Sequence, residues 1–150
     1  FAVRLANGAT GFDFILAAYH ARWEEGNTTA IKNEVKHIPK VFEAMKQARP
    51  GEDDLIIVGD FNLVTANMED AIGSSILTVG TGSTLNLKGE RTANLYDHML
   101  ILNSSATKEL LDNPVVLDVR DVATSPAVFY RTVSDHLPIR ARFRSGPDDD

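Results

Sequence analysis

The fold is decided by LIIVGDFN at residues 55–62. Its first four residues are apolar and mostly β-branched, and a short apolar run after a turn signal predicts a strand buried on both faces. We expect this strand to stop at Gly59, because glycine lets the backbone turn where a Cβ would clash. Asp60 and Asn62 follow two residues apart, so both side chains can point into one mouth at the strand end. A carboxylate beside a neutral donor suits a phosphate group and its metal ion.

Length and composition limit the class of protein. The 150 residues, 43% hydrophobic and 24% charged, are ordinary for one soluble globular domain. The sequence has no cysteine, so a metal ion must be bound by oxygen or imidazole. Neither a membrane-spanning apolar run nor a signal-peptide pattern is present. The chain opens in a strand-like pattern without an initiator Met, so we expect a missing upstream part; the compartment stays open, and a secreted parent is one interpretation.

The formal net charge of -6 argues against one functional class. Proteins that coat nucleic acid nonspecifically use clustered Lys and Arg. An enzyme acting on phosphates stays compatible, because an acidic metal-binding pocket is itself negative and its cation reverses the local field. The three Asp residues at 148–150 indicate a solvated tail, so we divide the chain into a domain at 1–145 and an acidic tail at 146–150.

The N-terminal residues predict an antiparallel hairpin. Strand patterns at 2–5 and 12–20 flank a loop with Asn-Gly and a further Gly. A period of two places His20 at the exit of the second strand, on the face that carries Phe12, Phe14, Leu16 and Ala18. Alone, His20 would be interpreted as a histidine capping a core face; only later motifs make it a candidate for the site.

A helical pattern follows the hairpin. Residues 27–29 offer N-cap side chains, and Pro39 interrupts the pattern, so we expect a kink or two consecutive helices before residues 49–51 end it. The apolar positions recur at spacings of three and four: Ile31, Val35, Ile38, Phe42 and Met45.

The middle of the chain has little periodicity. Residues 67–72 predict one or two helical turns, and the Gly-, Ser- and Thr-rich residues 73–94 predict a long loop, which in a compact domain is usually functional or disordered. Four polar side chains there could contact substrate, although solvent-facing polarity is the commoner explanation: Thr84, Asn86, Lys88 and Arg91.

The C-terminal part predicts three further segments. YDHMLIL at 96–102 and residues 115–119 are strand patterns, and the segment from there to Arg131 is predicted as loop. SDH at 134–136 precedes LPIRARF, whose alternation predicts a strand with one wet face and Pro138 at its start or on an edge. Each polar motif therefore sits at a strand end, where it could converge with His20.

In this order the motifs resemble the endonuclease/exonuclease/phosphatase superfamily, which has the fold of pancreatic-type deoxyribonuclease. GDFN at 59–62 and SDHLPI at 134–139 match its two most specific signatures, YDHMLI at 96–101 matches the third, and His20 matches its first histidine. The motifs are most similar to those of the bacterial deoxyribonuclease-like branch. The resemblance implies an α+β fold, the C-terminal half of a four-layer α/β/β/α sandwich.

The resemblance also implies that part of the domain is absent. Family domains are considerably longer, and their first half carries an Asn and a metal-binding Glu that nothing before His20 supplies. Half of a two-sheet sandwich leaves an apolar sheet face open, and such faces usually find a partner. We therefore expect a homo-oligomer or pairing with the missing half.

The activity that the resemblance implies is hydrolysis of a phosphate ester by in-line attack of water, assisted by Mg²⁺, with Mn²⁺ or Ca²⁺ as alternatives. Asp60 would orient or deprotonate the water or hold the metal, and Asn62 would donate to a phosphate oxygen. His136 would be an acid/base or phosphate-contacting group, and Asp97 would be the carboxylate that orients it. Asp135 would be a metal ligand, and His20 would be the second imidazole at the phosphate.

Two classes of function follow. The favoured one is a metal-dependent phosphodiesterase acting on DNA, with a phosphatase or sphingomyelinase of the same superfamily as the alternative. The other is a catalytically silent half-domain that acts by association. The sequence leaves activity of this chain by itself open, because it lacks the metal-binding Glu.

Overall fold

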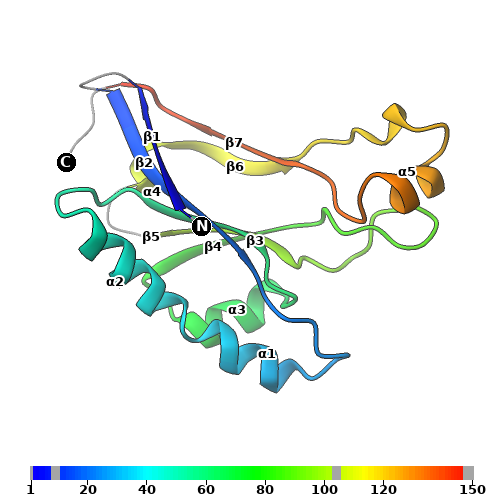
Figure 1. Cartoon of the computed structure of the whole chain (residues 1–150), viewed down its shortest axis with the longest axis horizontal. Coiled ribbons are helices and arrows are strands. Elements are labelled where there is room, and N and C mark those ends of the chain that lie inside the picture. The colour runs from blue at the N-terminus through cyan, green and yellow to red at the C-terminus, as the bar shows by residue number, and fades with distance from the viewer. Residues whose placement is uncertain (1, 8–10, 103–105, 147–150) are drawn as a thin grey trace.

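The computed structural model describes residues 2–7, 11–102 and 106–146, arranged in three layers (Figure 1). Helices cover one face of a mixed sheet, and a short antiparallel sheet lies against the other face. Among the described residues the large sheet has five strands in the order β1 (Ala2–Asn7), β2 (Gly11–His20), β3 (Leu55–Asp60), β5 (Asp97–Leu102) and β4 (Ile76–Thr81). The short sheet pairs β6 (Leu110–Val116) with β7 (Ile139–Phe143).

Strand β3 lies at the centre of the large sheet, as its apolar run predicts. It pairs parallel to β2 and antiparallel to β5, and Leu55, Ile56 and Ile57 are buried. The expected stop at Gly59 is wrong, because the strand continues through Gly59 to Asp60. Glycine is required there by close approach: a Cβ would lie 1.7 Å from the carbonyl oxygen of Tyr19 on β2.

The predicted hairpin is present as the antiparallel pair β1 and β2; of its turn, residues 8–10 lie outside the described residues. Strand β2 is packed on both faces rather than one. Ile15 and Ala17 face the helices, while Phe14 and Leu16 face the short sheet. The alternation that predicted one apolar face therefore describes the surface between the sheets.

The helical pattern divides into α1 (Thr28–Val35) and α2 (Ile38–Ala48), as Pro39 in the first turn of α2 predicts. Asn27 caps α1, its Oδ1 accepting from the Ala30 amide at 3.1 Å. Buried side chains of both helices and of α3 (Thr65–Ile72) pack on the sheet in one core, which includes Ile31, Val35, Ile38, Phe42, Met45, Met68 and Ile72.

Several elements lie where loop was predicted. Strand β4 falls inside residues 73–94, and β6 begins earlier than the predicted strand at 115–119. Helix α5 (Pro126–Thr132) lies in the predicted loop before Arg131, with Ser125 Oγ accepting from the Val128 amide at 3.3 Å. A short helix α4 (Ala106–Glu109) and a 3₁₀ turn η1 (Arg120–Val122) complete the elements. No helix in the described part of the chain is long and apolar enough to cross a membrane.

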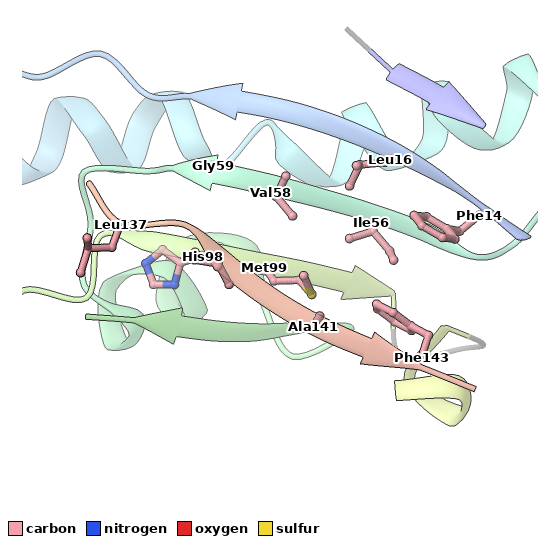
Figure 2. Close-up of a pocket in the computed structure, with 11 residues that line it drawn as sticks. Phe14, Leu16, Ile56, Val58, Gly59, His98, Met99, Leu137, Ala141 and Phe143 are labelled. Atoms are coloured by element: carbon pink, nitrogen blue, oxygen red, sulfur yellow. The ribbon is translucent and has the colours of Figure 1, made fainter. Parts of the chain in front are cut away.

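An apolar cavity of about 450 Å³, open on one side, lies between the two sheets. Figure 2 shows Phe14, Leu16 and Val58 on one side of it and Ala141 and Phe143 of β7 on the other. The ring of Phe143 stacks on two β2 rings, with centroids 5.2 Å from Phe12 and 5.9 Å from Phe14. These contacts hold β7, and thus the SDH segment before it, over the large sheet.

One backbone hydrogen bond lies at the predicted boundary between the domain and the tail. The amide of Phe12 donates to the carbonyl of Gly146 at 3.1 Å, so the first residue of the predicted tail lies beside β2. Residues 148–150 lie outside the described residues.

Candidate functional site

A row of polar side chains crosses the end of the large sheet. In the strand register His20 of β2 is opposite Asp60 of β3, and Asp60 is opposite Asp97 of β5. Asp97 is in turn opposite Thr81 of β4. Four strands therefore end their pairing at one level, which brings three of the predicted site residues together.

His136 joins this row from the segment before β7. Its Nδ1–H donates to the carboxylate of Asp97, 2.9 Å from Oδ2 and 3.0 Å from Oδ1. The ring therefore turns Nε2 toward Asp60, whose Oδ2 lies 3.5 Å away. The hydrogen bond with Asp97 raises the pKa of His136 above its ordinary value, against the lowering effect of burial.

Asp97 is buried but well supplied with donors. Ser83 Oγ donates to its Oδ2 at 2.5 Å and Thr84 Oγ1 to the same oxygen at 3.2 Å. Burial alone would raise the pKa of Asp97, but the hydrogen bonds from His136 and Ser83 outweigh it and lower the pKa. Asp97 is therefore an ionised carboxylate that fixes the orientation of the imidazole.

The segment that carries His136 is fastened to the loop after β4. The Leu85 amide donates to the Asp135 carbonyl at 2.8 Å, and the Leu137 amide donates to the Ser83 carbonyl at 3.0 Å. These backbone bonds flank His136 on both sides, so the ring is held at a defined distance from the strand ends.

Asp60 faces both imidazoles. Its Oδ1 accepts from the Asn62 amide at 2.9 Å, while Oδ2 lies 3.7 Å from His20 Nε2. Its side chain is 16% exposed. Burial raises the pKa of Asp60, against the lowering effect of the Asn62 hydrogen bond and of His136. This carboxyl is therefore more basic than an ordinary Asp.

Asn62 adopts a left-handed backbone with φ of 52°, which Asn tolerates better than most residues. Its Nδ2 donates to the Ala21 carbonyl at 2.8 Å. One amide hydrogen is thus used to tie β3 to the loop after β2, and the predicted contact of Asn62 with phosphate is left to the second hydrogen.

The two remaining candidates, His20 and Asp135, are open to solvent. The His20 side chain is 75% exposed, and the Asp135 side chain is 64% exposed with Oδ1 4.0 Å from His136 Nε2. Both side chains can therefore reach a ligand, and neither would lose a hydrogen bond to Asp60 or His136 by doing so.

His98, next to Asp97, has a structural position. Its Nε2–H donates to the Leu63 carbonyl at 2.6 Å, and the ring meets Phe61 edge-on. Burial lowers the pKa of His98. The neutral ring packs inside the molecule, facing the cavity between the sheets (Figure 2).

An open cavity of about 680 Å³ lies over the row of polar groups. Thr84 lines it, whereas the other loop candidates do not. Asn86 instead organises a turn, its Oδ1 accepting from the amides of Lys88 at 2.9 Å and Glu90 at 3.1 Å. Arg91 Nε donates to the Gly82 carbonyl at 2.7 Å. The lining residues are His20, Trp23, Asp60, Asn62, Thr84, Tyr96, Tyr130, Asp135 and His136.

Within residues 2–7, 11–102 and 106–146, no group of three or more His, Asp or Glu side chains is arranged to hold a metal ion. Asp60 and Asp135 are oxygen donors of the kind that Mg²⁺ uses. They do not by themselves fit a complete metal site.

Sequence reasoning missed four of the residues at this site. Ser83 sits in a polar segment without periodicity, so only the structure reveals its bond to Asp97. Trp23, Tyr96 and Tyr130 line the cavity. Of these Trp23 had a signal, because it is the only tryptophan of the chain and lies three residues after His20.

No protein-family model and no curated protein matches this sequence. Solved structures do match its fold. An endonuclease/exonuclease/phosphatase family protein from Bacteroides thetaiotaomicron has a TM-score of 0.57 and 19% identity, covering 89% of this chain and 51% of that chain. The chain has the fold of the endonuclease/exonuclease/phosphatase superfamily. The predicted resemblance and the α+β, deoxyribonuclease I-like fold are thereby confirmed.

Two further structures share this superfamily fold. D. rerio TDP2 complexed with single strand DNA product has a TM-score of 0.58 and 15% identity, over 89% of this chain and 57% of that chain. A mannosyl-6-phosphatase of Bacteroides thetaiotaomicron has a TM-score of 0.54 and 20% identity, over 87% of this chain and 51% of that chain. This chain thus spans little more than half the length of the structures it resembles.

Proposed function

We propose that this chain carries the His-Asp half of a phosphoester hydrolase site. The observation that carries the proposal is the geometry of His136: a buried carboxylate holds Nδ1, and Nε2 faces Asp60 across an open cavity. A fixed imidazole with a raised pKa, beside a carboxyl with a raised pKa, is an arrangement suited to acid–base chemistry.

The proposed reaction is attack of water on the phosphorus atom. Asp60 Oδ2 accepts a hydrogen bond and then a proton from the attacking water. Protonated His136 donates Nε2–H to a phosphate oxygen, which offsets the negative charge that develops there. A P–O bond to water forms, the P–O bond to the leaving group breaks, and the leaving oxygen takes a proton from solvent.

A divalent cation belongs to the proposal as a cofactor, with Mg²⁺ preferred and Mn²⁺ or Ca²⁺ as alternatives. Asp60 and Asp135 are the candidate ligands in this chain, and we infer a further protein ligand from outside the described residues, because the resemblance implies a metal-binding Glu that nothing before His20 supplies. A bound cation would neutralise charge on the phosphate. The need for a further metal ligand is also the reason to expect a homo-oligomer or a second half-domain.

The proposed substrate is nucleic acid, cleaved as a phosphodiester. Support comes from the likeness to a TDP2 structure complexed with single strand DNA product. The alternative is a phosphatase acting on a phosphomonoester, which the similar fold of a mannosyl-6-phosphatase supports. The third interpretation is a half-domain that has no catalytic activity by itself and acts by association with another chain.

The test is nicking of supercoiled plasmid by this chain with Mg²⁺ or Mn²⁺, with EDTA as control, alongside a synthetic phosphomonoester. We expect EDTA-sensitive nicking that Asp60→Asn and His136→Gln reduce at least about 100-fold. His37→Gln is the matched control, because His37 is exposed and makes no side-chain capping bond. Activity that survives both site substitutions would refute the proposal, and turnover of neither substrate with any metal would favour the silent half-domain.

A further inference from the structure

Three aromatic side chains line the cavity over His136 and Asp60. Trp23, Tyr96 and Tyr130 line it, whereas no Lys or Arg of the described residues does. Trp23 is 53% exposed, an unusual position for the largest apolar side chain. A substrate in this cavity therefore meets flat rings, not cationic side chains, beyond the polar groups at the strand ends.

The loop that carries Trp23 is fastened in place. Glu34 of α1 accepts from the Arg22 amide at 3.3 Å, and its other oxygen accepts from Tyr19 Oη at 2.6 Å. The side-chain amide of Asn62 is held to the same loop, because its Nδ2 donates to the Ala21 carbonyl at 2.8 Å. The bonds reach both sides of the site, so the exposed indole lies at a set position relative to Asp60.

Tyr96 supports the indole from the other side. Its ring centroid lies 6.3 Å from that of Trp23 with the planes tilted by 55°. Tyr96 is itself fixed, because it precedes Asp97 and its carbonyl accepts from the Phe61 amide at 2.9 Å. Trp23 stays 53% exposed despite this contact, so its free face for stacking is the part of the indole that Tyr96 does not cover.

We propose that the free face of Trp23 stacks on a nucleobase next to the scissile phosphate, with Tyr96 as the residue that positions the indole. This inference rests on the proposed function and narrows its substrate to nucleic acid with an unstacked base: single strands, frayed ends or short oligonucleotides. Stacking of one base on an aromatic side chain contributes about 1–3 kcal/mol, which is roughly 5- to 150-fold in affinity. The cavity volume of about 680 Å³ is in the range of sites that hold one small ligand, such as a single nucleotide.

Charge favours the same reading. The net charge is -6, and Arg22, the nearest cation in sequence to Trp23, is paired with Glu24 at 2.9 Å. A protein that tracks a phosphate backbone relies on many Lys and Arg contacts. Contacts to the base therefore add to the few phosphate contacts that this cavity offers.

The experiment uses Trp23 as its own reporter, because it is the only tryptophan in the chain. A short oligothymidylate and an abasic oligomer of equal length and charge are titrated against the fluorescence of the full chain in EDTA, which removes the proposed cation and so prevents turnover. We expect saturable quenching by the oligothymidylate at an affinity about tenfold above that of the abasic oligomer. Equal affinities for the two oligomers would overturn the inference and would point to recognition of the sugar-phosphate alone.

A second readout removes the reporter. Labelled oligomers are followed by anisotropy with Trp23→Ala, with Tyr96→Leu and with the control Leu87→Ala, which changes a side chain that is 77% exposed and does not line the cavity. Preference for the base should vanish in Trp23→Ala, weaken in Tyr96→Leu and persist in the control, with thermal unfolding verifying each fold. A base preference retained by Trp23→Ala would overturn the inference. These binding measurements do not depend on turnover. A preference for the base in a chain that fails the nicking assay would therefore refute the proposed hydrolysis and leave the stacking inference intact.

Discussion

His136 Nδ1 lies 2.9 Å from Asp97 Oδ2, although the two residues are 39 positions apart in the chain. Asp97 begins β5 of the large sheet, whereas His136 precedes β7 of the short sheet. The hydrogen bond therefore joins the end of a strand in one sheet to the segment that leads into the other sheet. The stacking of Phe143 on Phe12 and Phe14 supports the site by holding β7 against the large sheet.

Asp97→Asn should lower the pKa of His136. The carboxylate stabilises the imidazolium through a hydrogen bond and through its charge, and an amide supplies no such charge. If His136 acts in its protonated form, the rate declines as pH rises through its pKa, so in Asp97→Asn the alkaline decline should move to lower pH. NMR titration of the imidazole protons measures the pKa without requiring turnover.

The same spectra contain the control for Asp97→Asn. His37 is exposed, makes no side-chain capping bond and does not line the cavity, so the chemical shifts of its imidazole protons should be the same in the variant and in the wild-type chain. An unaltered His136 pKa in Asp97→Asn would show that the carboxylate does not control the imidazole.

His136→Gln should cost stability in a pH-dependent way. The pKa of His136 is raised in the folded chain, so its contribution is fully present below its unfolded pKa, about 6.5, and is lost as pH rises through the folded value. The difference in unfolding free energy between the wild-type chain and His136→Gln should therefore be largest in mildly acidic solution and shrink toward alkaline pH. Urea denaturation at a series of pH values measures it, and a difference that does not vary with pH would contradict the coupling.

How far the sequence predicts this molecule depends on the kind of signal. Strand β3 and the helices α1 and α2 follow from apolar periodicity and from Pro39, because burial imposes a spacing that can be read directly. Strand β4 was missed because its Thr and Gly positions resemble a loop; its pairing with β5 is a tertiary effect. Helix α5 was missed although Ser125 and Pro126 are a start signal, since the helix is only seven residues long.

The residues of the site also divide into those that a local sequence pattern predicts and those whose positions depend on tertiary structure. Asp60, Asp97 and His136 could be named because each stands beside an apolar strand pattern, and the structure brings them within hydrogen-bonding or ionic distance. The positions of Ser83 and Trp23 depend instead on where two loops fold back, and no local pattern encodes that. Asn86 illustrates the converse: a polar loop residue that satisfies its own turn and lies outside the cavity.

Ser83→Ala should weaken both stability and the site. Ser83 is fully buried and donates to Asp97 Oδ2 at 2.5 Å, so its removal takes one donor from a buried carboxylate. We expect a loss of about 1–3 kcal/mol in unfolding free energy. Thr84→Val is the graded comparison, because Thr84 donates to the same oxygen at 3.2 Å from a half-buried position and should cost less.

The pH dependence of Ser83→Ala has the opposite sense to that of His136→Gln. The pKa of Asp97 is lowered in the folded chain, so its contribution is present above the unfolded value and is lost as pH falls through the folded one. Without the Ser83 donor the folded pKa rises, and acid destabilisation should begin at a higher pH than in the wild-type chain. Thermal unfolding between about pH 2 and 6 tests this range, which brackets the ordinary Asp pKa. An unshifted acid limb would mean that the short Ser83 bond does not stabilise the ionised carboxylate.

Gly59→Ala should be the most damaging of these single changes. A Cβ at residue 59 would lie 1.7 Å from the Tyr19 carbonyl oxygen and 2.8 Å from its carbonyl carbon, and these are backbone atoms that cannot rotate away. The parallel strands β2 and β3 would have to separate at the point where they align His20 with Asp60. We expect a loss of more than about 3 kcal/mol in unfolding free energy, or failure to fold, from forced overpacking.

Gly146→Ala is the matched control for Gly59→Ala. A Cβ there would meet only the Arg144 side chain, at 3.6 Å, which is ordinary van der Waals contact. That variant should unfold in urea close to the wild-type midpoint, so a loss confined to Gly59→Ala cannot be attributed to replacing glycine in general. Equal midpoints for Gly59→Ala and the wild-type chain would mean that the two strands do not approach each other this closely, and that the alignment of His20 with Asp60 has another cause.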